Sequence, residues 1–249
     1  MSGHSKWSSI KHKKAVVDSR RGAQFSKLAR AIMVAERDGG GDPSANATLE
    51  NAIRKAKEVS MPKDNIERAI AKGTGEGGEA AAIESVVYEG YGPGGVAVLV
   101  EALTDNRNRT TADVRHAFTK NGGSLGEPGS VAYLFDKKGT IVIDATRYSE
   151  DDLMVAVDAG AGDITTDDDV FEVVCEQSDF AAVVAALERA GVEMESTEFG
   201  YRASSLVPVD EKQAGTLMHL IELLEDLDDV DAVHANFDVP ADVLERVAG

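Results

Sequence analysis

The sequence predicts an α+β protein, with an N-terminal three-helix domain followed by two ferredoxin-like α/β domains, one inserted in the other. Three observations predict this class. The first 73 residues contain three amphipathic helical patterns that glycine or proline separates. Residues 139–203 alternate strand and helix patterns in the order βαββαβ, which is typical of a ferredoxin-like unit. The segments on either side of that unit are each too short to fold alone, so we expect them to complete one another.

Composition is ordinary for a globular chain of this length. Of 249 residues, 43% are hydrophobic and 28% are charged. Cys175 is the only cysteine, which excludes an intramolecular disulfide and makes a cysteine-based zinc site unexpected. No apolar run approaches the ~20 residues needed to span a bilayer. The basic N-terminus lacks the apolar core of a signal peptide. We therefore expect a cytoplasmic protein without a membrane partner.

Charge is distributed unevenly along the chain. Residues 1–37 contain nine Lys or Arg against two acidic residues, a net charge of +7, whereas the whole chain carries −18. From Thr74 onward, 11 basic residues oppose 36 acidic ones, a net charge of −25. A net negative chain repels nucleic acid in general. Binding to a polyanion is therefore predicted to use local basic patches.

Three helices are expected in the first domain, after a polar arm over residues 1–16. The first begins at Asp18 or Ser19, which can cap it, and ends at the glycines 39–41. The second opens at Asp42–Ser44, and the third begins at Met61–Pro62 and ends at Gly73. Their apolar faces are predicted to consist of Phe25, Leu28, Ala29 and Ile32, then Leu49, Ala52, Ile53 and Ala56, then Ile66, Ala69 and Ile70.

The remaining elements follow a glycine-rich linker over residues 73–81. Two strands, 83–91 and 96–103, are joined by the turn 92–95, and a loop leads to a helix capped by Thr110 or Thr111. A further strand is expected at 131–135. The inserted unit is predicted to hold strands at 140–144, 163–166, 170–176 and 194–202 and helices at 149–159 and 178–190. A helix at 210–227 and a strand at 231–237 end the chain. The predicted domains are 1–73, 82–136 plus 204–249, and 137–203.

The basic arm and the first helix form one candidate site for nucleic acid. Each Lys or Arg there can neutralise a phosphate. Trp7 can stack on a base, which is worth ~1–3 kcal/mol. On a helical wheel, Lys27, Arg30 and Arg37 project opposite the apolar face. The alternatives are a disordered tail and a solvated helix face. The candidate residues are Lys6, Trp7, Lys11, His12, Lys13, Lys14, Arg20, Arg21, Lys27 and Arg30.

A second candidate site lies before and along the helix near residue 110. Arginine grips phosphate with two hydrogen bonds, and a helix N-terminus favours anions. The candidate residues are Asn106, Arg107, Asn108, Arg109 and Arg115. The alternative is a structural turn whose arginines pair with the acidic part of the chain. The basic residues do not gather on the second helix of a helix-turn-helix pair, so binding by phosphate and shape is favoured over base reading.

Enzymatic motifs are not apparent in the sequence. The five histidines form no Ser-His-Asp or Cys-His pattern, and no Gly-x-Ser-x-Gly elbow occurs. The acidic residues Glu225, Asp226, Asp228, Asp229 and Asp231 lack the spacing of an EF-hand and are predicted to be a solvated surface. Cys175 is expected to be a buried structural thiol. We therefore predict a protein that is not an enzyme and has no metal, cofactor or small-molecule substrate.

Several long strings resemble the YebC/PmpR family over nearly the whole chain. They are GHSKW-x-x-I-K-H-K-K at 3–14, M-P-K-D-N-I-E-R-A-I at 61–70, Y-E-G-Y-G-P-G-G at 88–95, T-D-N-R-N-R-T at 104–110, G-S-V-A-Y-L-F at 129–135 and L-E-D-L-D-D-V at 224–230. The resemblance implies a helical N-terminal domain and two α/β domains, one inserted in the other. It also implies a DNA-binding transcriptional regulator. Tyr133 stands where tryptophan is expected in the family.

The resemblance leaves two functions open. Besides the transcriptional regulators, the family includes a mitochondrial translational activator, and some bacterial members are described as ribosome-associated factors that ease synthesis through proline runs. The same basic patches would serve DNA in the first case and ribosomal RNA in the second. The first prediction is therefore a regulator that binds DNA. The alternative is a translation factor whose partners are ribosomal RNA and the ribosome.

Overall fold

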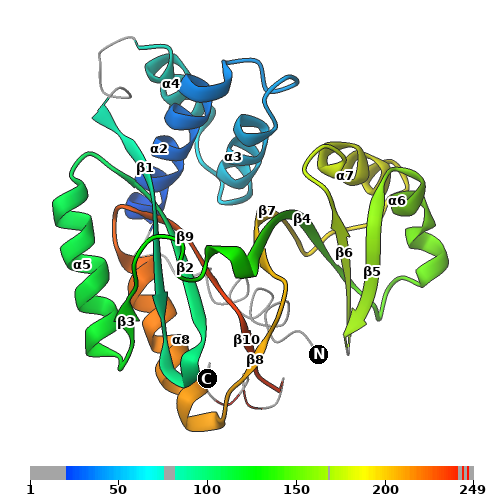
Figure 1. The fold of residues 1–249 in the computed structure, drawn as a ribbon. Helices are drawn as coiled ribbons and strands as arrows, with labels where there is room; N and C mark the ends of the chain where they lie inside the picture. The colour runs from blue at the N-terminus through cyan, green and yellow to red at the C-terminus, as the bar shows by residue number, and fades with distance from the viewer. Residues whose placement is uncertain (1–20, 76–81, 168, 241–242, 244–245, 247–249) are drawn as a thin grey trace.

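The computed structural model describes residues 21–75, 82–167, 169–240, 243 and 246. It confirms the predicted α+β class: helices come first, and two four-stranded antiparallel sheets follow, each with helices against one face (Figure 1). None of the helices in these ranges has the length and hydropathy needed to cross a membrane.

The first unit consists of α2 (Arg21–Gly39), α3 (Ala47–Glu58) and α4 (Lys63–Gly73). Its core contains the predicted apolar faces, with Ile32, Leu49 and Ala56 fully buried. The predicted start of the first helix lies outside the described residues. The second helix was predicted to open too early: Asn46, not Asp42–Ser44, caps α3, and its side chain accepts a hydrogen bond from the Leu49 N–H (3.1 Å). Asp42 instead closes a turn by accepting from the Ser44 N–H (3.0 Å).

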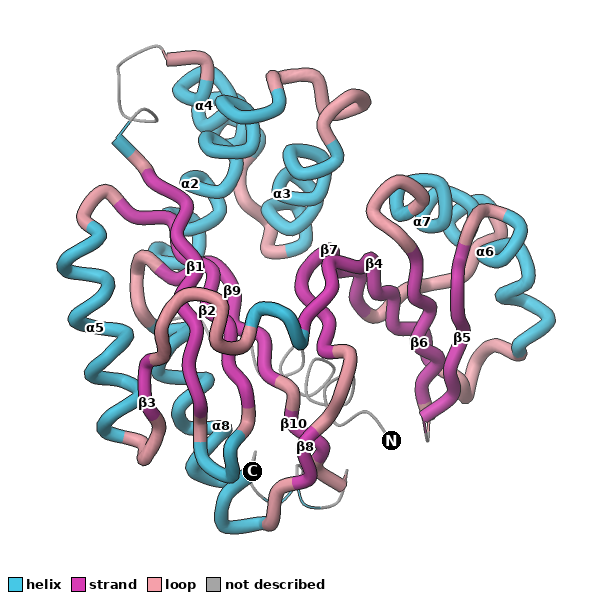
Figure 2. The backbone as a smooth tube through the Cα atoms, in the orientation of Figure 1, coloured by secondary structure: helices cyan, strands magenta, loops and turns pink. Residues whose placement is uncertain are grey.

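The second unit is a sheet in the order β3-β1-β2-β9, with α5 (Arg107–Lys120) and α8 (Glu211–Asp226) against one face (Figure 2). Its strands are β1 (Glu84–Tyr91), β2 (Ala97–Thr104), β3 (Ser124–Leu125) and β9 (Val230–Ala235). The turn η2 (Pro93–Gly95) joins β1 to β2. The strands β8 (Val207–Pro208) and β10 (Phe237–Asp238) pair separately. Strand β9 pairs with β2 although the two lie more than 100 residues apart, so segments from before and after residues 135–203 meet in this sheet.

The third unit is a sheet in the order β5-β6-β4-β7, which is the antiparallel arrangement of a βαββαβ unit. It contains β4 (Phe135–Asp144), η4 (Glu150–Leu153), α6 (Met154–Asp158), β5 (Ala161–Asp167), β6 (Val170–Cys175), α7 (Phe180–Arg189) and β7 (Ser196–Ala203). Both α/β units therefore consist of one sheet with helices against one face, but their strand orders differ. Cys175 is buried, and burial raises the pKa of its thiol to about 11, which confirms the predicted structural thiol.

The strand predicted at 131–135 is wrong. Residues Ala132–Leu134 form the 3₁₀ turn η3, and β4 begins only at Phe135. The cause is the buried carboxylate of Glu89, which accepts hydrogen bonds from the N–H groups of Gly129 (2.6 Å), Val131 (2.7 Å) and Ala132 (2.7 Å). These donors are therefore unavailable to a neighbouring strand.

Candidate nucleic-acid interface

The predicted arm residues cannot be placed. Lys6, Trp7, Lys11, His12, Lys13, Lys14 and Arg20 lie outside the described residues, and Arg21 is described only by its backbone. The remaining predicted residues belong to α2 and α5, and the structure assigns them different environments.

The first turn of α5 contains residues that were predicted to be a loop. Asn106 is the N-cap, and its side chain accepts a hydrogen bond from the Arg109 N–H (3.1 Å). The Asn106 N–H in turn donates to the Thr104 hydroxyl (2.9 Å). The helix therefore begins at Arg107 rather than after Thr110 or Thr111. Asparagine is as good an N-cap as serine or aspartate and better than threonine, which accounts for this choice.

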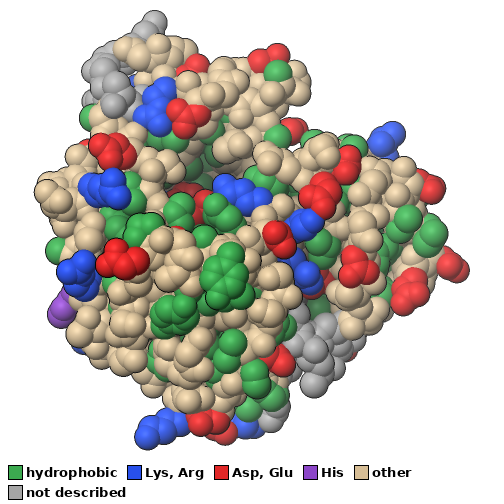
Figure 3. All heavy atoms as spheres, in the orientation of Figure 1, with side chains coloured by type: hydrophobic (Ala, Val, Ile, Leu, Met, Phe, Trp, Pro, Cys, Tyr) green, Lys and Arg blue, Asp and Glu red, His purple; other side chains and the backbone are tan. Residues whose placement is uncertain are grey.

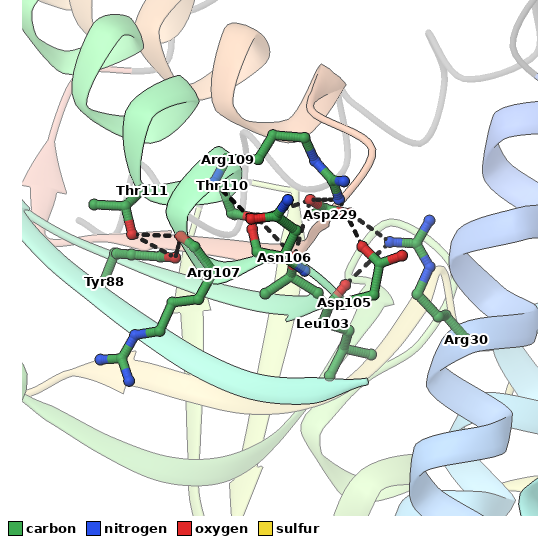
Figure 4. A network of polar contacts seen from close by, with 11 residues as sticks. Arg30, Tyr88, Leu103, Asp105, Asn106, Arg107, Arg109, Thr110, Thr111 and Asp229 are labelled. Atoms are coloured by element: carbon green, nitrogen blue, oxygen red, sulfur yellow. Dashed lines mark hydrogen bonds and ion pairs between the residues drawn. The ribbon is translucent and has the colours of Figure 1, made fainter. Parts of the chain in front are cut away.

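Asp229 joins α2, β2 and α5 in one polar network, shown in Figure 4. Arg30 Nη1 donates to Asp229 Oδ1 (2.8 Å), and Arg109 Nη2 donates to Oδ2 (2.6 Å). The hydroxyls of Thr104 (3.1 Å) and Thr110 (2.7 Å) also donate to Oδ2. We call these five residues the Asp229 network. The carboxylate at its centre is buried, so the prediction that it belongs to a solvated acidic surface is wrong for Asp229.

The charge on Asp229 is strongly favoured by its donors. Burial alone would raise the pKa of this carboxyl, but the hydrogen bonds from Arg109 and the two threonines outweigh burial and hold the pKa below its usual range. Arg109 also pairs with Asp105 (2.9 Å). The alternative stated for this segment, an arginine paired with the acidic part of the chain, therefore describes Arg109.

On the basic side of α2, Lys27 and Arg30 are partly buried against protein, whereas Arg37 is exposed but still contacts it. Lys27 Nζ donates to the Glu225 carbonyl (2.5 Å), and burial lowers the pKa of Lys27 against the opposing effect of nearby acids. Arg30 also donates to the Leu103 carbonyl (3.0 Å), and Arg37 donates to the Ile83 carbonyl (2.6 Å). The helical wheel gave the direction of these side chains correctly. The alternative of a solvated face is wrong for Lys27 and Arg30, because the second unit packs on that side of α2.

Arg107, Asn108 and Arg115 remain exposed, and we call them the α5 surface. The carbonyl of Arg107 accepts from the Thr111 hydroxyl (2.7 Å), while its guanidinium extends away from the Asp229 network (Figure 4). Within the described part of the chain, the guanidinium groups of Arg107 and Arg115 have no ion-pair partner. Asn108 and Arg115 are seven residues apart and therefore share a helix face. The first turn of α5 contains no acidic residue.

The α5 surface has the chemistry of an anion site. The free N–H groups at a helix N-terminus carry partial positive charge, and two unpaired guanidinium groups lie on the same short helix. Arginine is suited to planar recognition of phosphate. The Asp229 network lies beneath the first turn of this helix and fixes its position on the sheet.

Sequence reasoning missed two residues that organise this region, Asp229 and Glu89. A buried carboxylate is not distinguishable from a solvated one by composition, particularly within a run of acids such as 225–231. The available signal was position: each lies inside a string used for the family resemblance, Y-E-G-Y-G-P-G-G and L-E-D-L-D-D-V.

Two family models match consecutive parts of the chain. Residues 5–76 match the model described as the TACO1/YebC protein N-terminal domain. Residues 83–237 match the model described as the TACO1/YebC second and third domain.

Curated relatives and a solved structure match over nearly the full length. A probable transcriptional regulatory protein from Rubrobacter xylanophilus is 52% identical over 250 residues, and one of the same name from Thermobifida fusca is 52% identical over 249 residues; the match covers 100% of both chains in each case. The crystal structure of a conserved hypothetical protein from Aquifex aeolicus is 48% identical, with a TM-score of 0.81 over 93% of this chain and 96% of that chain. This chain belongs to the TACO1/YebC family.

Proposed function

We propose that this chain is a non-enzymatic regulator of gene expression that binds DNA through its basic patches. The observation that carries the proposal is the α5 surface, where Arg107 at the start of the helix and Arg115 two turns later are exposed and, among the described residues, have no ion-pair partner. The names of the full-length relatives, which are probable transcriptional regulatory proteins, support the same function.

The basic arm is proposed as the second contact. Residues 1–37 carry a net charge of +7 from nine basic and two acidic residues. Three of the basic residues, Lys27, Arg30 and Arg37, bind protein groups, and the arm supplies most of the others. Neutralised phosphates release counterions, so affinity should fall steeply as salt rises. The acidic remainder of the chain would repel nucleic acid that does not reach both patches.

A translation factor that binds ribosomal RNA is the second candidate, and one observation favours it. The helix α5 follows β2 and packs flat on the sheet, so it is not the second helix of a helix-turn-helix pair. Phosphate and shape recognition without groove reading suits structured RNA. In that case the chain would bind the ribosome and ease synthesis that stalls at proline runs.

The test compares two probes on the full chain: a promoter-derived DNA duplex and a structured ribosomal RNA fragment of equal length. Dissociation constants are measured by fluorescence anisotropy at several salt concentrations. Tighter binding to the duplex is expected for the transcriptional role. Tighter binding to RNA, together with co-sedimentation with ribosomes in lysate, would replace it with the second candidate. Absence of binding to both probes at low salt would contradict nucleic-acid binding altogether.

A further inference from the structure

A cavity of about 230 Å³ lies where the third unit meets the second. The third unit contributes residues of β4, β6 and β7 to its lining, and β9 of the second unit contributes His234 and Ala235. Pockets for drug-sized ligands have volumes of about 300–1,000 Å³. This smaller cavity therefore suits a ligand of few atoms, which would contact both units at once.

One face of the third sheet forms the floor of the cavity. Residues such as Ile141 and Val173 pack under α6 and α7, and alternate residues of the same strands point to the opposite face. On that opposite face, Val142 of β4 lies between Glu172 of β6 and Ser196 of β7. The next row of the register brings Thr140 of β4 beside Glu198 of β7. The floor therefore combines carboxylates, hydroxyls and an apolar side chain.

The polar groups of this floor have unused hydrogen-bonding capacity. Glu172 is 5% exposed, and among the described residues its one hydrogen bond comes from Arg202 Nη2 to Oε2 (3.1 Å). An ionised carboxylate offers about four acceptor positions, and a buried one is costly without partners. The hydroxyls of Thr140 and Ser196 have no hydrogen-bond partner in the described ranges. A ligand that donates several hydrogen bonds would satisfy all three groups.

The charge of the third unit selects a cation as this ligand. Residues 135–203 contain 5 basic residues against 17 acidic ones, a net charge of −12, and Figure 3 shows acidic side chains predominating over this unit, on the right of the view. The cavity itself is lined by the carboxylates of Glu172 and Glu198 and by the single guanidinium of Arg202. Such a field attracts cations and repels nucleic acid. A metal ion is not favoured, because the described residues hold no group of three His, Cys, Asp or Glu placed to bind one.

We propose that this cavity binds the ammonium group of a small aliphatic amine. An ammonium group has three donors and no acceptor, which matches acceptors on Glu172, Ser196 and Thr140. Its methylene groups would lie against Val142 and Leu206, which also line the cavity. The same chemistry has two sources, a free amine and a lysine side chain of the basic arm.

The test measures binding of putrescine, a diaminobutane, to the full chain by isothermal titration calorimetry. The wild type is expected to bind putrescine and not butanediol, which has the same length without the charges. Glu172→Gln should weaken binding about tenfold, the size of one hydrogen bond to a charged group. Ser196→Ala leaves the Glu172–Arg202 ion pair in place and should weaken binding about fivefold. Glu176→Gln is the matched control, since Glu176 is exposed and pairs with Lys138 outside the cavity lining.

A variant without the lysines of the arm distinguishes the two sources. It carries Lys6→Ala, Lys11→Ala, Lys13→Ala and Lys14→Ala. If one of these lysines occupies the cavity, this variant should bind putrescine more tightly than the wild type does. Equal affinity of the two proteins would assign the cavity to a free amine.

Two results would overturn the site. One is wild-type affinity of Glu172→Gln for putrescine, which would place the amine on the acidic surface outside the cavity. The other is absence of putrescine binding by both the wild type and the variant without arm lysines. Thermal unfolding without amine checks that each variant folds. If Glu172→Gln does not fold, Ser196→Ala decides by the same criterion.

Discussion

At the scale of single residues, two buried carboxylates determine the surface that the molecule presents. Asp229 fixes Arg30 and Arg109, and Glu89 fixes three N–H groups in the turn at residues 129–132. Neither contacts the proposed ligand. Their effect is to decide which neighbouring side chains are paired: Arg109 is paired in the Asp229 network, while Arg107, two residues earlier, is not.

The first prediction concerns Asp229→Asn. Removing the charge leaves two guanidinium groups, 22% and 48% exposed, without their shared partner, and loss of hydrogen bonds to a charged group costs about 2 kcal/mol. We expect the free energy of unfolding in urea at pH 7 to fall by about that amount. Asp228→Asn changes an exposed neighbour and should have little effect. Equal stability of the Asp229 variant and the wild type would show that the network does not stabilise the fold.

The difference in free energy of unfolding between the wild type and Asp229→Asn should depend on pH in a defined direction. The pKa of Asp229 is lower in the folded protein than in the unfolded chain. Its stabilising contribution is therefore complete above the ordinary aspartate pKa of about 3.9 and is lost as the pH falls through the folded value. The gap between wild type and Asp229→Asn should be constant near neutral pH and shrink in acid.

At the scale of elements, sequence predicts what is periodic and local. Sequence periodicity identified the helices α2, α3, α4, α5 and α8, because within each helix the apolar residues recur every three or four positions. The hydrophobic cores contain these residues, which confirms the predicted faces. The turn η3 was mistaken for a strand because Val131–Phe135 has strand composition, while the group that prevents pairing, Glu89, lies 42 residues from Val131. The candidate site divides in the same way: the exposure of Arg115 follows from helix geometry, whereas the pairing of Arg30 depends on Asp229, which lies 199 residues away.

The second prediction separates capping from ligand contact at Asn106. Asn106→Asp keeps a side-chain acceptor for the Arg109 N–H, and aspartate caps as well as asparagine. Stability measured by thermal unfolding should therefore be retained. The added negative charge at the start of α5 should weaken nucleic-acid binding, most strongly at low salt. Asn106→Ala is expected to lose about 1 kcal/mol of stability. Unchanged affinity of the aspartate variant would place the ligand away from this helix end.

At the scale of the whole molecule, basic side chains of the helical unit hold it against both other units. Lys27, Arg30 and Arg37 reach the second unit, and Arg54 reaches the third, where Nη2 donates to the Thr197 carbonyl (3.1 Å) and the guanidinium lies 5.5 Å from the Phe180 ring centre. This use of cations could not be predicted from sequence, because it depends on contacts between units rather than within a helix.

The domain boundaries 1–73, 82–136 plus 204–249, and 137–203 stay a prediction, which limited proteolysis tests. Arg54→Ala removes the contact to Thr197 and should speed cleavage between the helical unit and the rest. Mass spectrometry of the fragments should place early cuts near residues 73–82, 136 and 203. Arg68→Ala is the control, since the hydrogen bonds of Arg68 to described residues stay within its own helix. First cleavage inside 137–203 would contradict the proposed division.

The central claim is that the cations of the α5 surface are available to nucleic acid and those of α2 are used inside the protein. Salt dependence of the dissociation constant tests it directly, because each phosphate contact adds about 0.9 to the slope for a duplex. Arg107→Ala/Arg115→Ala should lower the slope by about 1–2 and leave the unfolding temperature unchanged. Lys27→Ala/Arg30→Ala, measured below its unfolding temperature, should keep the slope and lower that temperature. The reverse assignment of the two effects would contradict the account.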